Sequence, residues 1–188
     1  MNHSLLHQSL KQAFIIKKGT YPYLIHPLLD GIPEIPPQLL HEVVSVMKEQ
    51  ITPYLPFDKI VTIEAMGIPI ASLLSIELNS PLTIIRKRKY GFKDEHMVQQ
   101  QTGYASSKLY INGLKKDDQV IIVDDVVSTG QTLQTVIKKL QELKINVKGV
   151  FLIVDKGSMA YKLEEEMHIP FFALSTIELI NDHVQIIK

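Results

Sequence analysis

Short runs of apolar, often β-branched residues alternate along this chain with segments of helical periodicity, and this alternation limits the folds that the chain can adopt. Four runs are almost continuously apolar and predict buried strands: 59–64, 82–86, 119–124 and 147–154. Amphipathic helices are predicted after the first run, at 69–78, and after the third, at 131–143. Strands buried on both faces and joined by helices form a parallel sheet, so an α/β fold is predicted. In such sheets ligands bind beyond the carboxyl ends of the strands.

The N-terminal part of the chain has a different pattern. Leu6, Leu10 and Phe14 recur at four-residue spacing and predict a short amphipathic helix over 4–16. Pro, Gly and Tyr are frequent between residues 17 and 38, which predicts irregular structure with one short strand at 23–26. A helix is predicted to begin at Pro36 and Pro37, because the first helical turn tolerates proline; its apolar face is expected to comprise Leu39, Leu40, Val43, Met47 and Ile51.

Length and composition restrict the class of protein. The 188 residues fit one domain, which we divide into an N-terminal part, 1–56, and a core, 57–188. Twenty basic residues balance twenty acidic ones, so no net charge favours nucleic acid or an anionic membrane as a partner. The absence of cysteine excludes disulfides, thiolate metal sites and a cysteine nucleophile. No signal peptide and no apolar run approaching the ~20 residues of a membrane span is present, so a cytoplasmic location is expected.

The segment from Val120 to Thr132 carries the strongest chemical signal. A buried strand ends in two adjacent acids, Asp124 and Asp125, and a turn at 128–132 leads into a helix. Unpaired backbone N–H groups and the helix dipole favour an anion at such a turn, and Gly130 permits a close approach. Hydroxyl donors are supplied by Ser128, Thr129 and Thr132. A phosphate site beside two hydroxyl-accepting carboxylates matches a ribose 5-phosphate.

This segment resembles the signature of the type I phosphoribosyltransferases, in which four apolar residues, two acids and two apolar residues precede a Ser/Thr-Thr-Gly-x-Thr turn. The resemblance implies that Asp124 and Asp125 contact the ribose hydroxyls, directly or through a water-bound Mg²⁺. It also implies which residues hold the 5-phosphate: Val127, Ser128, Thr129, Gly130, Gln131 and Thr132. The alternative is an ordinary strand–turn–helix whose hydroxyls only cap the helix. Neither the P-loop spacing nor the dinucleotide-binding spacing occurs in the chain.

Two further segments resemble parts of the same family. The loop after the first strand contains Ala65, Met66 and Gly67, and the equivalent loop of the family binds pyrophosphate. The basic run 86–89 resembles the start of the family's mobile loop, which implies a catalytic role for Arg86 and Lys87 and a diphosphate contact for Lys89. Taken alone, these segments could be an ordinary turn and a solvated basic surface. The polar stretch 87–106 shows neither strand nor helix periodicity and is expected to be an irregular functional loop.

Lys156 is the candidate for base recognition. It follows the strand that ends at Asp155, and in 6-oxopurine enzymes a lysine at this place donates to the exocyclic oxygen. A solvent-exposed lysine on a turn is the alternative. Residues 23–33 resemble the hood, the N-terminal segment that covers the base in this family. Other hypoxanthine–guanine enzymes have an aspartate at the position of Ser128, and Glu95 is a candidate replacement for that acid, although a surface glutamate is the simpler interpretation.

The resemblance, which is greatest to the archaeal-type hypoxanthine/guanine enzymes, implies a parallel-sheet type I phosphoribosyltransferase fold with a small N-terminal hood. The implied reaction moves the 5-phosphoribosyl group of 5-phosphoribosyl 1-diphosphate (PRPP) to hypoxanthine, guanine or xanthine, with release of pyrophosphate. Mg²⁺ is the implied cofactor and a homodimer the implied assembly. Two alternatives are an adenine phosphoribosyltransferase and a non-catalytic PRPP-sensing regulator. The regulator is disfavoured because only a short helix and a proline-rich segment precede the core.

Overall fold

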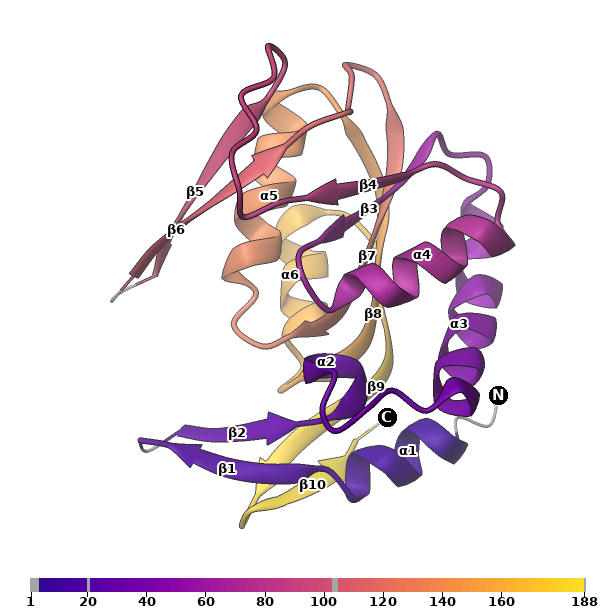
Figure 1. Cartoon of the computed structure of the whole chain (residues 1–188), viewed down its shortest axis with the longest axis vertical. Coiled ribbons are helices and arrows are strands. Elements are labelled where there is room, and N and C mark those ends of the chain that lie inside the picture. The colour runs from indigo at the N-terminus through magenta and orange to yellow at the C-terminus, as the bar shows by residue number, and fades with distance from the viewer. Residues whose placement is uncertain (1–3, 20, 103–104, 188) are drawn as a thin grey trace.

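The computed structural model describes residues 4–19, 21–102 and 105–187, and its centre is a six-stranded sheet (Figure 1). The strand order is β10-β9-β8-β7-β3-β4, and only the edge strand β10 is antiparallel to its neighbour. The strands are β3 (Lys59–Ile63), β4 (Leu82–Ile85), β7 (Gln119–Val127), β8 (Asn146–Lys156), β9 (Phe171–Ile180) and β10 (His183–Ile186). The predicted α/β class with a mainly parallel sheet is therefore confirmed.

Helices cover both faces of this sheet, as Figure 1 shows. One face packs against α3 (Pro37–Ile51) and α4 (Gly67–Glu77), and the other against α5 (Gln131–Glu142) and α6 (Met159–Met167). Side chains of β7 point alternately to the two faces: Ile121 lies in the hydrophobic core with α3 and α4, and Ile122 in the core with α5 and α6. Burial on both faces explains why the central parts of β3, β7 and β8 are mainly apolar on both sides. Within the described ranges, no helix is long and apolar enough to cross a bilayer.

The N-terminal part forms α1 (Ser4–Lys11), a hairpin of β1 (Phe14–Lys18) and β2 (Tyr21–Ile25), α2 (Pro27–Asp30), then α3 and the short η1 (Thr52–Tyr54). The first helix ends earlier than predicted, because Phe14 begins β1 and pairs with Ile25. The four-residue spacing of Phe14 therefore did not mark a helical face, and its side chain is 67% exposed. The predicted strand at 23–26 and the helix after Pro36 are present. The division at residue 56 stays a prediction.

The sequence predicts irregular structure over 87–106, but part of this stretch forms regular strands. Residues His96–Thr102 form β5 and Ala105–Ile111 form β6, which pair as an antiparallel hairpin. Apolar side chains of this hairpin, Val98, Leu109 and Ile111, are buried in the core that contains α5. The prediction failed because few apolar residues mark these strands, while the pairing rests on backbone hydrogen bonds that any sequence can make. Elements that the sequence analysis did not assign also include α6, β9 and β10.

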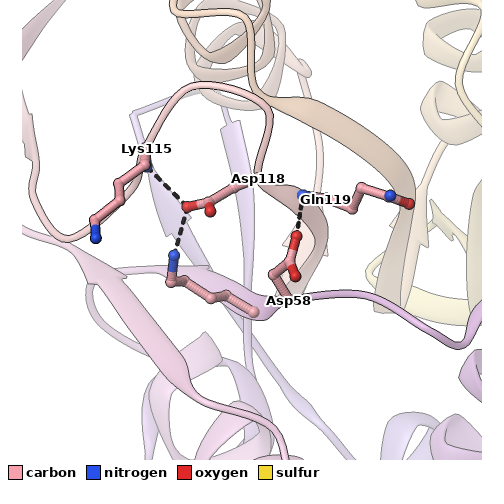
Figure 2. A network of polar contacts seen from close by, with 5 residues as sticks. Asp58, Lys115, Asp118 and Gln119 are labelled. Atoms are coloured by element: carbon pink, nitrogen blue, oxygen red, sulfur yellow. Dashed lines mark hydrogen bonds and ion pairs between the residues drawn. The ribbon is translucent and has the colours of Figure 1, made fainter.

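A polar network joins the amino ends of β3 and β7, at the edge of the sheet opposite the carboxyl ends (Figure 2). The Gln119 amide donates to Asp58 Oδ2 at 2.7 Å, and the Asp58 amide donates to the Gln119 carbonyl at 2.7 Å. Asp118 accepts from the Lys115 amide at 2.8 Å and from the ammonium of Lys59. Burial would raise the pKa of Asp118, but the bonds from Lys59 and Lys115 outweigh it and lower the pKa. These contacts fix the strand that carries the two acids.

We expect Asp118→Asn to lower the free energy of unfolding by about 1–3 kcal/mol at neutral pH, the usual cost of losing a charge-assisted hydrogen bond. A lowered pKa gives stability that is present above the unfolded value, near 3.8, and is lost as the pH falls through the folded value. Urea denaturation from pH 7 to pH 3 would measure the difference. Asp117→Asn is the matched control, because Asp117 is the adjacent acid and its own side chain is 78% exposed. Equal stability of the two variants at pH 7 would contradict this role.

Candidate functional site

A cavity of about 400 Å³ opens at the carboxyl ends of β3 and β7. Its lining includes most of the residues that the sequence analysis assigned to the sugar phosphate. The lining residues are Ile63, Glu64, Ala65, Lys87, Leu109, Asp124, Asp125, Val126, Val127, Ser128, Thr129, Gly130, Thr132 and Leu133. We call this cavity the sugar-phosphate cavity.

The order of the strands explains why these groups meet. β7 lies between β3 and β8, and all three run parallel, with Val61 opposite Ile122 and Asp124 opposite Leu152. Parallel strands end at one edge of the sheet, so the loops that follow them converge there. Glu64, Asp124 and Lys156, distant in the sequence, are thus brought to the same edge.

The two acids are half-buried and face the cavity. The Asp125 amide donates to Asp124 Oδ1 at 3.0 Å. Burial, with the charge of Asp125 added to it, raises the pKa of Asp124 well above its usual range. Burial also raises the pKa of Asp125 to about 6; hydrogen bonds oppose this rise, and the charge of Asp30 adds to it. Two acids held this close favour a proton, a cation or hydroxyl donors between them.

A glycine permits the close packing behind Asp124. A Cβ at Gly67 would lie 2.7 Å from Asp124 Oδ1 and 2.3 Å from Thr62 Oγ1, which is closer than atoms can approach. Gly67 thus lets the start of α4 lie directly against the end of β7, and it is packed behind the cavity without lining it. The peptide bond between Glu64 and Ala65 is cis.

The turn after β7 has the geometry of an anion site. Gly130 has φ +74°, where other residues are strained, and a Cβ there would lie 2.9 Å from Leu163 Cδ1, so a larger residue would also displace Leu163. Gly130 is also the N-cap of α5 and has no side chain with which to cap the helix. The backbone N–H groups in the first turn of this 12-residue helix therefore lie next to the cavity. Of the predicted phosphate residues, Gln131 is exposed and does not line the cavity.

Glu64 is a cavity residue to which the sequence analysis gave no role. Its Oε2 accepts from Arg86 Nε at 3.0 Å and from the Lys87 amide at 3.0 Å. The pKa of Glu64 is lowered chiefly by the Lys87 backbone bond, with the Arg86 charge contributing. Glu64 thereby fixes the start of the basic run, and Lys87 lines the cavity. A signal was present, since one acid ends the first strand and four cations follow the second.

Three other residues predicted to contact the diphosphate, Met66, Arg86 and Lys89, lie outside the cavity lining. The guanidinium of Arg86 lies 5.9 Å from the ring centroid of Tyr90, and Lys89 also lies off the cavity. The side chain of Met66 lies next to the hood: its Cε would be 3.6 Å from a Cβ placed on Gly31. Ala65 does line the cavity, and its contact with pyrophosphate stays a prediction.

A second, smaller cavity of about 100 Å³ adjoins the first and shares Val126 and Ser128 with it. The rest of its lining comes from the hood and from the ends of β8 and β9: Tyr23, Leu24, Leu29, Asp30, Val154, Lys156 and Ile177. The ammonium of Lys156 donates to the carbonyl of Pro22 at 3.3 Å, which places it against the hood. We call this the base cavity, after the ligand that the sequence analysis predicts for Lys156. Its lining is largely apolar, with two charged side chains, Asp30 and Lys156.

Glu95 lies in neither cavity lining. Its carboxylate accepts from the amides of Tyr90 and Gly91, at 2.8 and 3.0 Å, and from Asn112 Nδ2 at 3.1 Å. Burial would raise the pKa of Glu95, but these three bonds outweigh it and the pKa is lowered. In this arrangement Glu95 holds the turn before β5.

Comparison with known proteins gives one consistent result. Residues 49–183 match the family described as the phosphoribosyl transferase domain. The hypoxanthine/guanine phosphoribosyltransferase of Ferroglobus placidus is 49% identical over 180 residues, covering 96% of this chain and 95% of the relative. The enzyme of the same name from Methanohalobium evestigatum is 48% identical over 181 residues, covering 96% and 94%.

Solved structures give the same fold. Adenine phosphoribosyltransferase from Saccharomyces cerevisiae superimposes with a TM-score of 0.73 at 21% identity, covering 91% of this chain and 99% of that one. The enzyme of the same name from Leishmania tarentolae gives a TM-score of 0.75 at 16% identity, covering 94% and 89%. At such low identities these likenesses show the shared fold alone.

We expect Asp125→Asn to change how stability depends on pH. Because folding raises the pKa of this acid to about 6, it contributes stability that is full below its unfolded value, near 3.8, and is lost as the pH rises through about 6. The free energy of unfolding of the wild type, relative to the variant, should thus fall by on the order of 1–3 kcal/mol from pH 4 to pH 7. Urea denaturation in EDTA would measure it, with the exposed Asp94→Asn as control. A constant difference across this range would contradict the raised pKa.

Proposed function

Because this chain belongs to the phosphoribosyltransferase family, we propose that it transfers the 5-phosphoribosyl group of PRPP to a 6-oxopurine and releases pyrophosphate. The observation that carries the proposal is the pair of adjoining cavities at one sheet edge. The sugar-phosphate cavity has two acids at one side and a helix N-terminal turn at the other. The base cavity opens beside it, so a sugar in the first would meet a ring in the second.

Each part of the sugar-phosphate cavity has a distinct task in this proposal. The turn 128–132 would hold the 5-phosphate through backbone N–H groups and hydroxyls. Asp124 and Asp125 would accept hydrogen bonds from the ribose hydroxyls. Lys87 would neutralise the departing pyrophosphate, with Arg86 and Lys89 reaching it as the basic run moves. Ala65, Met66 and Gly67 would form the pyrophosphate loop, with Gly67 acting through its backbone.

The residues present also fit Mg²⁺. Asp124 and Asp125 are adjacent carboxylates whose pKa values are raised by burial, with the charge of Asp125 adding to the rise at Asp124 and the charge of Asp30 adding to it at Asp125; a divalent cation would relieve this cost. Mg²⁺ commonly keeps several waters and is bound through one or two carboxylates and substrate phosphates, so this pair of acids could hold it through water. When bound, Mg²⁺ would supply charge neutralisation for the diphosphate and the ribose hydroxyls.

The base is a 6-oxopurine in this proposal because of Lys156. An ammonium group only donates, so it matches the C6 carbonyl of hypoxanthine, guanine or xanthine and not the C6 amine of adenine. Relatives with 42–49% identity include several hypoxanthine/guanine enzymes, whereas the adenine enzymes described above share the fold at 16–21% identity. The adenine alternative therefore fits less well. A non-catalytic sensor would leave the basic run without a function. The homodimer and the cytoplasmic location stay predictions.

We expect purified protein to release pyrophosphate from PRPP and Mg²⁺ when hypoxanthine or guanine is added. A panel with xanthine, adenine and orotate would rank the bases by kcat/KM. Asp125→Asn should reduce the rate with hypoxanthine by at least about a hundredfold, because it removes one of the acids facing the sugar. Release with adenine alone would favour the first alternative, and PRPP binding without release with any base would favour the sensor.

We expect Lys156→Leu to lower kcat/KM for hypoxanthine and guanine by about 10–100-fold, since the C6 oxygen loses its charged donor. The rate with adenine should stay the same or rise. Lys162→Leu makes the same chemical change at an exposed position of α6 and is the matched control. Unchanged use of 6-oxopurines by the Lys156 variant would remove the argument for that residue.

A further inference from the structure

Asp30, the last residue of α2, supplies the only carboxylate among the described residues that line the base cavity. Building on the proposed function, we propose that Asp30 determines base specificity by accepting a hydrogen bond from N1–H of the 6-oxopurine. Lys156 would donate to the neighbouring O6. The sequence gave no pattern that marked Asp30, and the structure brings it to the cavity through the fold of the hood.

The carboxylate of Asp30 is held in a defined orientation. The hydroxyl of Tyr23 donates to Oδ1 at 2.8 Å, and the amide of His26 donates to Oδ2 at 3.0 Å. Each carboxylate oxygen can accept a second hydrogen bond, so capacity for a ligand remains. An acceptor fixed in this way loses little conformational entropy on binding.

The segment that carries Asp30 is itself anchored in the core. The ring of His26 is fully buried: its Nδ1 accepts from the Leu28 amide at 3.2 Å, and its Nε2 lies 2.9 Å from Ser9 Oγ. Burial lowers the pKa of His26 to about 4, although the charge of Asp30 opposes this effect, so the ring is neutral at physiological pH. The buried Leu28 then secures the single turn of α2 that ends at Asp30.

Asp30 and Lys156 are attached to the same short piece of the hood. Tyr23 bonds to Asp30, and the carbonyl of the preceding residue, Pro22, accepts from Lys156 at 3.3 Å. A fixed acceptor and a fixed donor thus lie against successive residues of β2. The other walls of the cavity are mainly apolar and suit the faces of a flat ring: Leu24, Leu29, Val126, Val154 and Ile177.

This pair of groups is complementary to one type of purine edge. In hypoxanthine, guanine and xanthine, the acceptor O6 stands next to the donor N1–H. In adenine the order is reversed, because the C6 amine donates and N1 accepts. A carboxylate cannot donate and an ammonium cannot accept, so adenine would place its C6 amine against the ammonium and its N1 lone pair against the carboxylate, and neither contact would be a hydrogen bond. Sites that hydrogen-bond a substrate N–H strongly disfavour an analogue that lacks it.

The test compares hypoxanthine with 1-methylhypoxanthine, which has no N1–H, in the wild type and in Asp30→Ala. We expect the wild type to prefer hypoxanthine by at least about tenfold in kcat/KM, and the variant to lose most of that preference. The loss should appear in hypoxanthine KM, while KM for PRPP changes little. Glu34→Ala, an exposed acid four residues away that lies outside the base cavity, is the matched control and should keep the wild-type preference.

A second variant separates base recognition from support of the hood. Asp30→Asn keeps the shape of the side chain, and its amide can donate to N1 of adenine, so the ratio of adenine to hypoxanthine use should rise about tenfold or more. A residue that only supports the hood would lower the rates with all bases alike and leave both ratios unchanged, and that result would overturn the inference. If Asp30→Ala does not fold, as judged by circular dichroism, the Asp30→Asn ratio decides.

Failure of the proposed function would look different. If the wild-type protein releases no pyrophosphate with hypoxanthine, guanine or xanthine, the proposed function is refuted. A wild-type protein that is active with hypoxanthine, and whose preference over 1-methylhypoxanthine survives in Asp30→Ala, would refute only the role of Asp30.

Discussion

The position of β7 in the middle of the parallel sheet is the constraint on which the other features depend. Its pairing with β3 on one side and β8 on the other brings three strand ends to a single edge. That one arrangement brings together the two acids, the loop that begins at Glu64, and Lys156. Gly67 completes it, because only a residue without Cβ lets α4 begin against Asp124. Sheet order and one close contact therefore position the whole site.

The charges at this edge are arranged at a cost to stability. Asp124 and Asp125 are half-buried next to each other, and their pKa values are raised as a result. Such pairs are characteristic of functional sites, where a substrate or cation supplies the missing partner. At the opposite edge, Asp118 has its partners within the chain and a lowered pKa. The two ends of β7 thus differ in kind: one is satisfied by the protein, and the other is prepared for a ligand.

The two cavities divide recognition between two parts of the chain. In the proposed function, the sheet edge supplies the groups for the sugar and its phosphates, whereas the hood contributes Tyr23 and Asp30 to the base cavity, which Lys156 of β8 also lines. Val126 and Ser128 belong to both linings and mark the place where sugar and base would meet.

Local sequence determined the features that depend on neighbours along the chain. The apolar runs predicted β3, β4, β7 and β8, and the acids and turn after Val123 predicted the sugar-phosphate edge, because strand burial and a helix N-terminus are encoded within a dozen residues. Tertiary structure alone decided the β5–β6 hairpin, the strand at Phe14, the pairing of Glu64 with the basic run, and the presence of Asp30 in the base cavity. Each of these rests on contacts between distant segments, made by backbone hydrogen bonds or by single polar side chains. Such contacts leave no periodic pattern in the sequence, so only the folded chain shows them.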